Sequence, residues 1–452
     1  MKSTNRDKHN ILLEGSISWG LFLFALPLFG SSLIQQLYNT VDLIFVGQLL
    51  DNEASVAVGS SSLLVTCLVG FFNGLGVGVS IIAARAFGAR NRAMLNKTIH
   101  AAAGLALIGG VLLTLIGLLG SPWFLRWMNT PEQVMEPALV YLRIYFFDIM
   151  AIIFYNISAG LLRALGNSRA PMLYQLVGGL INVALNALLT MVVPLGIAGV
   201  AIGTLVGQSA AAALTVWHLC RLQEPYHLQF RHIRLQTRIC WQIFAIGIPA
   251  GIQAMVTTLS NLIVQAQINS MDVLDIAAFT AYFKVENFIY LPILALGQAL
   301  TTYVGQNLGA GQESRAFQGV RKGLQIGVGI TLLIGLMLVL SSDLFFGIFN
   351  KDVAVQEIGR GIGLVTFPLY FIYVFVELLS GALRGAGHAV QPMALTLFNM
   401  CVMRVVLLLM VMAVAPVPEK VAWIYPATWL LNAACLLGYY EWAKRRPGGL
   451  CC

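Results

Sequence analysis

Residues 33–47 read Leu-Ile-Gln-Gln-Leu-Tyr-Asn-Thr-Val-Asp-Leu-Ile-Phe-Val-Gly and place a carboxylate within an otherwise apolar stretch. Gln35, Tyr38, Asn39 and Asp42 recur at i, i+3, i+4 and i+7, so they share one face of the helix predicted there. In lipid such a carboxylate costs about 2.5 kcal/mol or more and is usually retained for function. We therefore interpret Asp42 as the coupling residue of a transporter. The alternative is a polar group that only fixes helix packing.

The composition indicates a polytopic helical membrane protein. Of the 452 residues, 58% are hydrophobic and 10% are charged, whereas soluble proteins contain about 25% charged residues. A membrane-spanning helix satisfies its backbone hydrogen bonds within one segment, and the alternation typical of a membrane barrel is absent from the sequence. The seven cysteines show no metal spacing. We expect no metal, no cofactor and, despite the net charge of +8, no nucleic-acid partner.

Twelve apolar stretches are long enough to cross a bilayer, which takes about 20 residues. They lie near residues 16–46, 55–83, 98–120, 135–160, 169–193, 197–219, 241–267, 275–300, 320–341, 357–383, 390–413 and 421–442. Lys and Arg gather at both ends of the chain and in alternate loops, which predicts that both termini are cytoplasmic. The expected location is the bacterial inner membrane, in which the chain is multi-pass.

The chain repeats itself with an offset of 221 residues. Residues 160–172 (Gly-Leu-Leu-Arg-Ala-Leu-Gly and, after four residues, Pro-Met) match residues 381–393 (Gly-Ala-Leu-Arg-Gly-Ala-Gly and, after four residues, Pro-Met). We predict two pseudo-symmetric six-helix bundles, an N-terminal lobe at 1–219 and a C-terminal lobe at 240–452, joined by a cytoplasmic linker at 220–239. Because six is even, both lobes enter the membrane from the same side, with the substrate path between or within them.

Four motifs occur in order along the chain: Gln35-x-x-Tyr-Asn-x-x-Asp42 with Phe45-Val-Gly47, Ala84-Arg-Ala-Phe-Gly-Ala-Arg90, Lys284-Val-Glu286 with Leu291-Pro292, and Gly305-Gln-Asn-Leu-Gly-Ala-Gly311. Their order resembles the multidrug and toxic compound extrusion (MATE) family over nearly the whole chain. The resemblance implies a V-shaped, all-α membrane protein of twelve transmembrane helices. It also implies an inner-membrane antiporter that expels organic cations, driven by H⁺ or Na⁺.

In proton-linked members of that family, the acid of the first helix works with polar residues of helices four to six. The resemblance assigns this role to Asp42 and implies as its partners Tyr141, Asn156, Asn182 and Thr204. Tyr38 and Asn39 are added to the predicted site because they share the helix face of Asp42, and Asn186 is added because it shares the helix face of Asn182. Asn186 stands where some members carry a second carboxylate. Asn182 and Asn186 lie one helical turn apart and are either part of this cluster or interhelical packing groups. Asp148 either joins the cluster or pairs with a nearby arginine.

The second half carries its own intramembrane charges. Sodium-linked members use carboxylates of the C-terminal lobe, and Glu377 stands roughly where one of these lies. Glu286 is also intramembrane, and Arg404, near the middle of its span, requires an anion. Glu377 and Glu286 are the candidate anions for Arg404. They form with it either a static buried pair or a second-lobe cation or proton site that competes with Arg404, so the coupling ion, H⁺ or Na⁺, is open.

A drug-sized organic cation requires an apolar, adaptable pocket with few polar groups, for which Met and aromatic side chains are suited. The residues proposed for this substrate pocket are Gln35, Phe154, Met172, Met255 and Tyr282. No phosphate-binding loop and no zinc or hydrolase motif is present in the sequence, which argues against ATP driving and against an enzyme.

The predicted function is secondary antiport of lipophilic, mostly cationic compounds out of the cell by a monomer in the lipid bilayer. One alternative is a flippase for lipid-linked precursors from the same superfamily. The other is a membrane scaffold or receptor that transports nothing.

The predicted topology can be tested with a peptide tag. A tag after Cys452 should resist a protease added outside intact cells and be cleaved once the membrane is opened. A tag inserted beside Lys351, in a loop predicted to lie outside, should be cleaved in intact cells. External cleavage of the C-terminal tag would overturn the topology.

Overall fold

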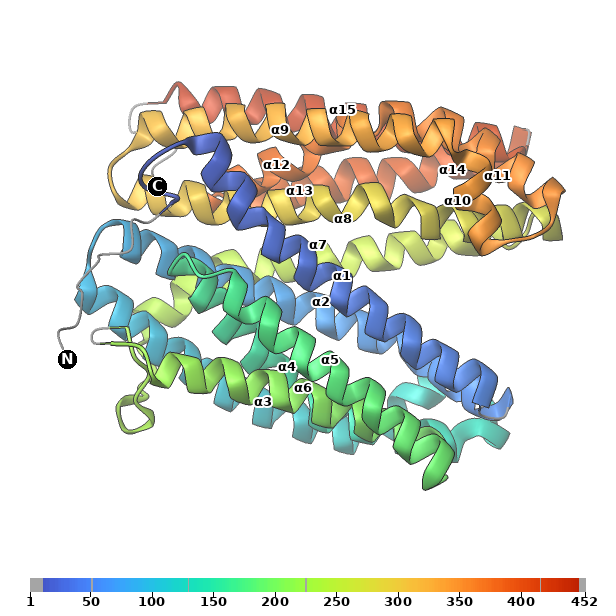
Figure 1. Cartoon of the computed structure of the whole chain (residues 1–452), viewed down its shortest axis with the longest axis horizontal. Helices are drawn as coiled ribbons and strands as arrows, with labels where there is room; N and C mark the ends of the chain where they lie inside the picture. Colours follow the sequence, from blue (N-terminus) through green and yellow to red (C-terminus); the bar gives the residue numbers. More distant parts are fainter. Residues whose placement is uncertain (1–10, 50–51, 129, 224–225, 415, 447–452) are drawn as a thin grey trace. The chain divides into compact units, whose positions relative to one another are not determined.

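The chain is described from a computed structural model that places residues 11–49, 52–128, 130–223, 226–414 and 416–446, and the regular elements among them are all helical (Figure 1). The elements before the polar linker are α1 (Ile17–Leu49), α2 (Asn52–Gly88), α3 (Arg92–Trp127), α4 (Glu132–Ala164), α5 (Arg169–Ala187), η1 (Leu188–Val192) and α6 (Ile197–Cys220). The later elements are η2 (Phe230–His232), α7 (Thr237–Ile268), α8 (Val273–Gly309), α9 (Glu313–Leu340), α10 (Ser342–Phe349), α11 (Val353–Thr366), η3 (Phe367–Leu369), α12 (Phe371–Gly385), α13 (Val390–Thr396), η4 (Leu397–Met403), α14 (Arg404–Val414) and α15 (Pro418–Lys444).

Within the placed residues, 11 helices are long and apolar enough to cross a membrane. A twelfth span arises if Val353–Leu369 and Phe371–Gly385, bent by 52° at their junction, are counted as one. This agrees with the predicted all-α membrane fold. The bend itself was not predicted, since 357–383 reads as one apolar run. Pro368 lies at this junction, in the 3₁₀ turn η3, and proline removes a backbone donor and bends helices.

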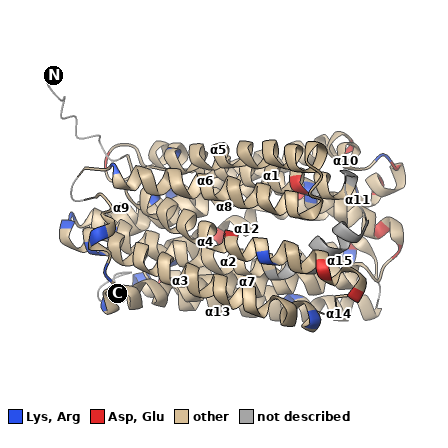
Figure 2. Cartoon of the chain, turned by 90° about the horizontal axis from the view of Figure 1, so that it is seen from below, with Lys and Arg blue, Asp and Glu red and all other residues tan. Residues whose placement is uncertain are grey.

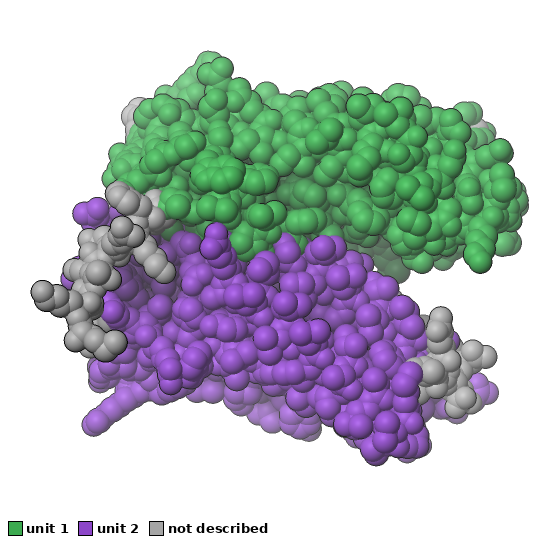
Figure 3. Space-filling model, in the orientation of Figure 1, with its two compact units in different colours: residues 1–29, 256–452 green, residues 30–255 purple. Residues whose placement is uncertain are grey.

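The chain forms two compact units, coloured separately in Figure 3. One consists of residues 30–255, and the other combines residues 1–29 with 256–452. The unit boundaries therefore fall inside α1, shortly after Pro27, and inside α7, shortly after Pro249. They differ from the predicted lobes at 1–219 and 240–452, which describe the sequence repeat and stay a prediction.

The sequence repeat recurs in the helix packing inside each unit. A Cβ atom on Gly160 of α4 would lie 2.8 Å from the carbonyl oxygen of Gly76 of α2. At the equivalent positions, a Cβ atom on Gly381 of α12 would lie 2.7 Å from the carbonyl oxygen of Gly297 of α8. Small residues let membrane helices approach this closely, so the repeated glycines explain which helices touch.

Charged residues are concentrated near helix ends, and the helices between these ends are largely free of Lys, Arg, Asp and Glu (Figure 2). This pattern is typical of a membrane protein, because a charge inside the hydrocarbon layer is costly. The few charges that lie within apolar spans therefore identify candidate functional positions.

Two equivalent turns differ in backbone strain. The turn after α2 places Arg90 at φ 51°, and the turn after α8 places Gly311 at φ 72°. In both turns the next amide reaches back to the helix, from Asn91 to the Ala86 carbonyl at 3.0 Å and from Gln312 to the Asn307 carbonyl at 2.8 Å. Left-handed backbone is unstrained for glycine and strained for other residues.

We predict that Gly311→Ala lowers the free energy of unfolding by about 1 kcal/mol. A Cβ atom there would meet nothing within 4 Å, so the loss would come from backbone strain alone. Thermal unfolding of the purified protein in detergent measures the change. Gly329→Ala is the matched control, since Gly329 also has open space but lies inside α9, where alanine favours the helix. Equal effects of both substitutions would contradict the assignment.

Candidate functional site

The site in the unit of residues 30–255 begins with a close approach of α5 and α6. A Cβ atom on Gly178 would lie 2.6 Å from the Gly207 carbonyl oxygen, and one on Gly207 would lie 2.5 Å from that of Gly178. One turn before Gly207 in α6, Gly203 leaves the space that the side chain of Asn186 occupies. Three glycines therefore bring the asparagine face of α5 against α6.

Asp42 is held by donors from both of these helices. Nδ2 of Asn186 donates to Oδ1 of Asp42 at 2.5 Å, and Oγ1 of Thr204 donates to Oδ2 at 3.3 Å. Asn186 is fully buried, and Asp42 is partly buried. Helices α1, α5 and α6 therefore converge on this carboxylate. Hydrogen bonds to a charged group contribute more to stability than hydrogen bonds between neutral groups.

The donors of Asp42 are themselves held in place. Nδ2 of Asn182 donates to Oγ1 of Thr204 at 3.2 Å, and Asn182 is 2% exposed. Directly after Asn186 the helix widens into the π-turn η1, in which the hydroxyl of Thr190 donates to the backbone carbonyl of Asn186 at 2.6 Å. Such π-turns occur often at functional sites, and here the threonine satisfies a carbonyl at the turn.

A cavity of about 400 Å³ lies beside Asp42. A volume of this size suits a small organic ligand. Seven residues predicted for the site or the substrate pocket line it: Gln35, Tyr38, Asn39, Asp42, Tyr141, Asn156 and Thr204. Asn182 and Asn186 are not in this lining, but Asn186 donates directly to Asp42 and Asn182 donates to Thr204.

Some lining residues were not among the predicted site residues. Tyr145, Gln175 and Gln208 face the cavity, and Nε2 of Gln175 donates to the hydroxyl of Tyr38 at 3.5 Å. Gln208 follows Thr204 by one turn, so its helical spacing could have identified it. Asp148, for which the sequence left membership of the cluster open, also lines the cavity. It is 2% exposed, and its Oδ1 has no hydrogen-bond partner among the placed residues.

Other predicted residues have different surroundings. The Asn156 amide donates to the carbonyl of Ile152 in its own helix at 3.0 Å rather than to Asp42. Phe154, Met172 and Met255 are not among the residues lining this cavity, and Sδ of Met172 instead lies against Gly30. Tyr282 belongs to the other unit. It is fully buried there and stacks on Phe367 with ring centroids 5.6 Å apart, so it is a core residue.

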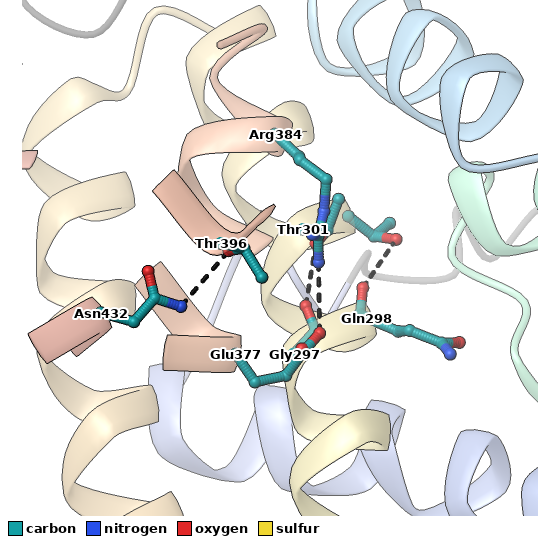
Figure 4. Close-up of polar contacts among 8 residues, drawn as sticks. Gly297, Gln298, Thr301, Glu377, Arg384, Thr396 and Asn432 are labelled. Carbon is teal, nitrogen blue, oxygen red and sulfur yellow. Dashed lines mark hydrogen bonds and ion pairs between the residues drawn. The ribbon is translucent and has the colours of Figure 1, made fainter. Parts of the chain in front are cut away.

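In the unit of residues 1–29 and 256–452, Glu377 pairs with an arginine of its own helix. Oε1 of Glu377 lies 3.2 Å from Nη2 of Arg384, and both side chains are 13% exposed (Figure 4). Gly297 of α8 makes room for this pair, because a Cβ atom there would lie 2.7 Å from Cγ of Glu377. Glu377, which the sequence left open together with Glu286 as an anion for Arg404, is therefore paired with Arg384 instead. The sequence places Arg384 two turns beyond Glu377, at i+7 on the same helix face.

Glu286 and Arg404 line a second cavity of about 350 Å³ in this same unit. The hydroxyl of Tyr370 donates to Oε1 of Glu286 at 2.9 Å. Nε and Nη2 of Arg404 both lie 3.4 Å from Oγ1 of Thr428. The three predicted second-lobe residues are thus divided, with Glu286 and Arg404 at one cavity and Glu377 outside its lining.

Comparisons with known proteins agree with this architecture. The MatE family model matches residues 27–188 and 249–410. YoeA of Bacillus subtilis (strain 168), a probable multidrug resistance protein, is 25% identical over 443 residues and covers 95% of each chain. An FAD transporter of Shewanella oneidensis is 25% identical over 421 residues and covers 90% of each chain. A solved structure of a multidrug resistance MATE family transporter of the MOP superfamily, in its outward-facing conformation, has a TM-score of 0.88 at 22% identity over 96% of this chain and 97% of that chain.

A double-mutant cycle tests the contact at the centre of the site. Asp42→Ala and Asn186→Ala should show a coupling energy of about 0.5 to 1 kcal/mol in the free energy of unfolding. Denaturant unfolding of the four purified proteins measures it. Asp42→Ala with Asn156→Ala is the matched control cycle, because both residues line the cavity but Asn156 donates to Ile152. A coupling energy near zero in the first cycle would contradict the hydrogen bond.

Proposed function

The chain belongs to the MATE family, whose members are transporters and not enzymes, and we propose that it is a secondary active antiporter that exports lipophilic, mostly cationic compounds. The proposed coupling ion is H⁺, which enters the cell as the compound leaves. YoeA is named for multidrug resistance, and the Shewanella relative is named for FAD, so the family alone leaves the cargo of this chain open. The class of compound that this chain carries is therefore inferred from its own cavity.

The observation that carries the proposal is the position of Asp42. Its carboxylate lies within an apolar span, accepts hydrogen bonds from two neighbouring helices and lines a cavity large enough for a small organic compound. Tyrosine rings also line this cavity, and aromatic faces attract organic cations. An acid in such surroundings suits both a proton and a cationic ligand.

We infer that the proton and the compound compete for this one charge. With Asp42 ionised, the cavity attracts a cation. With Asp42 protonated, the attraction is lost and the cation leaves. Pro27 lies inside α1 before the polar face, and its missing donor allows the helix to bend there between the two states.

The coupling ion is assigned to H⁺ at Asp42 rather than to Na⁺ in the other unit. Glu377 is paired with Arg384 at 3.2 Å, and a guanidinium that already neutralises the carboxylate disfavours a bound cation. Glu286 accepts a hydrogen bond from Tyr370 and shares its cavity with Arg404, so the charge nearby is positive. These contacts weaken the case for a second-lobe cation site.

We further propose that the protein works as a monomer in the bacterial inner membrane with both termini in the cytoplasm. The spans found by length and composition support the membrane location. The distribution of Lys and Arg supports the orientation.

Asp42→Asn tests the coupling role, because the amide mimics a permanently protonated acid. The variant should insert and purify like the natural protein but lose efflux of a cationic dye from proteoliposomes under an imposed pH gradient. Asp343→Asn is the matched control, since the Asp343 side chain is 82% exposed and pairs with Arg360 at the surface. The same vesicles are then tested under an imposed Na⁺ gradient. Full efflux by Asp42→Asn, together with loss in Glu377→Gln, would move coupling to the second unit and favour Na⁺.

A further inference from the structure

The cavity of about 350 Å³ in the unit of residues 1–29 and 256–452 is not used by the coupling scheme above. It has the size of a ligand pocket and is lined by aromatic rings together with a small number of polar and charged groups. Its most unusual lining residue is Arg404, which begins α14 within the apolar span Val390–Val414.

Arg404 makes its direct contacts with neutral groups among the placed residues. Its side chain donates to the hydroxyl of Thr428, and its guanidinium lies 5.0 Å from the centroid of the Tyr425 ring. The residue is 5% exposed, and no ion pair to a carboxylate is found for it in the described part of the chain. A buried guanidinium without an anion is costly, so a site that retains one gains by binding an anionic group.

The opposite charge on this cavity belongs to Glu286. Its Oε1 accepts the hydrogen bond from Tyr370, and within the described residues it forms no ion pair with Arg404. The cavity therefore presents a carboxylate and a guanidinium that do not neutralise each other by direct contact. Such an arrangement suits a ligand that carries both charges, since each charged group would find its own partner.

Aromatic rings form a further part of the lining. The ring centroid of Trp429 lies 4.6 Å from that of Tyr370 and 5.7 Å from that of Tyr373, and Tyr290 lies 5.8 Å from Tyr373. Tyr370 and Trp429 are buried, whereas Tyr290 and Tyr373 are partly exposed and can offer ring faces and edges to a flat aromatic group. Apolar contact and two fixed charges together define the ligand class.

We propose that this cavity binds aromatic zwitterions, with the acidic group on Arg404, the amino group on Glu286 and the ring against Tyr290 and Tyr373. The site is separate from Asp42 and belongs to the other unit. That such compounds are exported rests on the proposed function, whereas their binding to the cavity does not.

Three naphthyl compounds of one size test the proposal on the full-length protein in detergent. They are 3-(2-naphthyl)alanine, a zwitterion, 3-(2-naphthyl)propionate, an anion, and 2-(2-naphthyl)ethylamine, a cation. Equilibrium dialysis against protein-free micelles measures binding, and no ion gradient is involved. We expect the zwitterion to bind at least about tenfold more tightly than the cation, as a charged hydrogen bond would provide. Equal binding of all three compounds would overturn the proposal.

Variants identify the residues involved. Arg404→Met should weaken the zwitterion and the anion by about tenfold or more and should not weaken the cation, because it removes a positive charge from the cavity. Glu286→Gln should weaken the zwitterion and the cation. Lys284→Met is the matched control. It removes a cation from the helix of Glu286, but Lys284 is absent from the lining and its Nζ lies 5.8 Å from the centroid of the Phe349 ring. Zwitterion affinity that is unchanged in Arg404→Met would refute the site.

If Arg404→Met does not elute as a folded protein, Arg404→Lys replaces it. Lysine keeps the charge but not the two-pronged geometry, so the anion should still bind, more weakly than to the natural protein. The comparison of the three compounds on the natural protein stands in either case. Binding of the zwitterion without its gradient-driven export would contradict the proposed function and leave the cavity assignment intact.

Discussion

A charge inside an apolar span is costly unless nearby groups compensate it, and the arrangement of both units depends on this constraint. In one unit, Asn186 and Thr204 reach Asp42 from α5 and α6. In the other, Glu377 and Arg384 compensate each other within α12. Arg404 is the exception, with a hydroxyl and a ring face as its partners among the placed residues. The two compensated sites and the uncompensated one differ accordingly in what they can bind.

Compensation at Asp42 depends on glycine. Asparagine and threonine side chains are short, so α5 and α6 must approach closely before their polar atoms can meet a carboxylate on α1. Gly178 and Gly207 permit that approach, and Gly203 leaves space for the Asn186 amide. A larger side chain at any of the three positions would meet a backbone carbonyl oxygen or the Asn186 amide and would separate the donors from Asp42. Much of the coupling site is therefore encoded in residues without functional groups.

The parts of the structure that depend on local pattern could be predicted from the sequence, and those that depend on tertiary contacts could not. Long apolar runs located the spans, and helical spacing together with the family resemblance brought Asp42, Asn182, Asn186 and Thr204 into one cluster. The pairing of Glu377 with Arg384 was missed. Glu286 and Glu377 were both available as anions for Arg404, and the choice between them depends on three-dimensional position. The π-turn η4 before Arg404 also escaped prediction. One added residue rotates the rest of the helix by about 100°, and an apolar run gives no sign of it.

The division of α1 and α7 between the units bears on how such a chain arose. Residues 17–29 of α1 belong to the unit built mainly from the second half, and residues 237–255 of α7 belong to the unit built mainly from the first half. Each unit is completed by the opening turns of a helix that belongs to the other half of the chain, and one half alone would lack them. A half-length ancestor would therefore have needed two copies that exchanged the opening turns of their first helices, as in a domain-swapped dimer. Gene fusion would then have made that exchange permanent within a single chain.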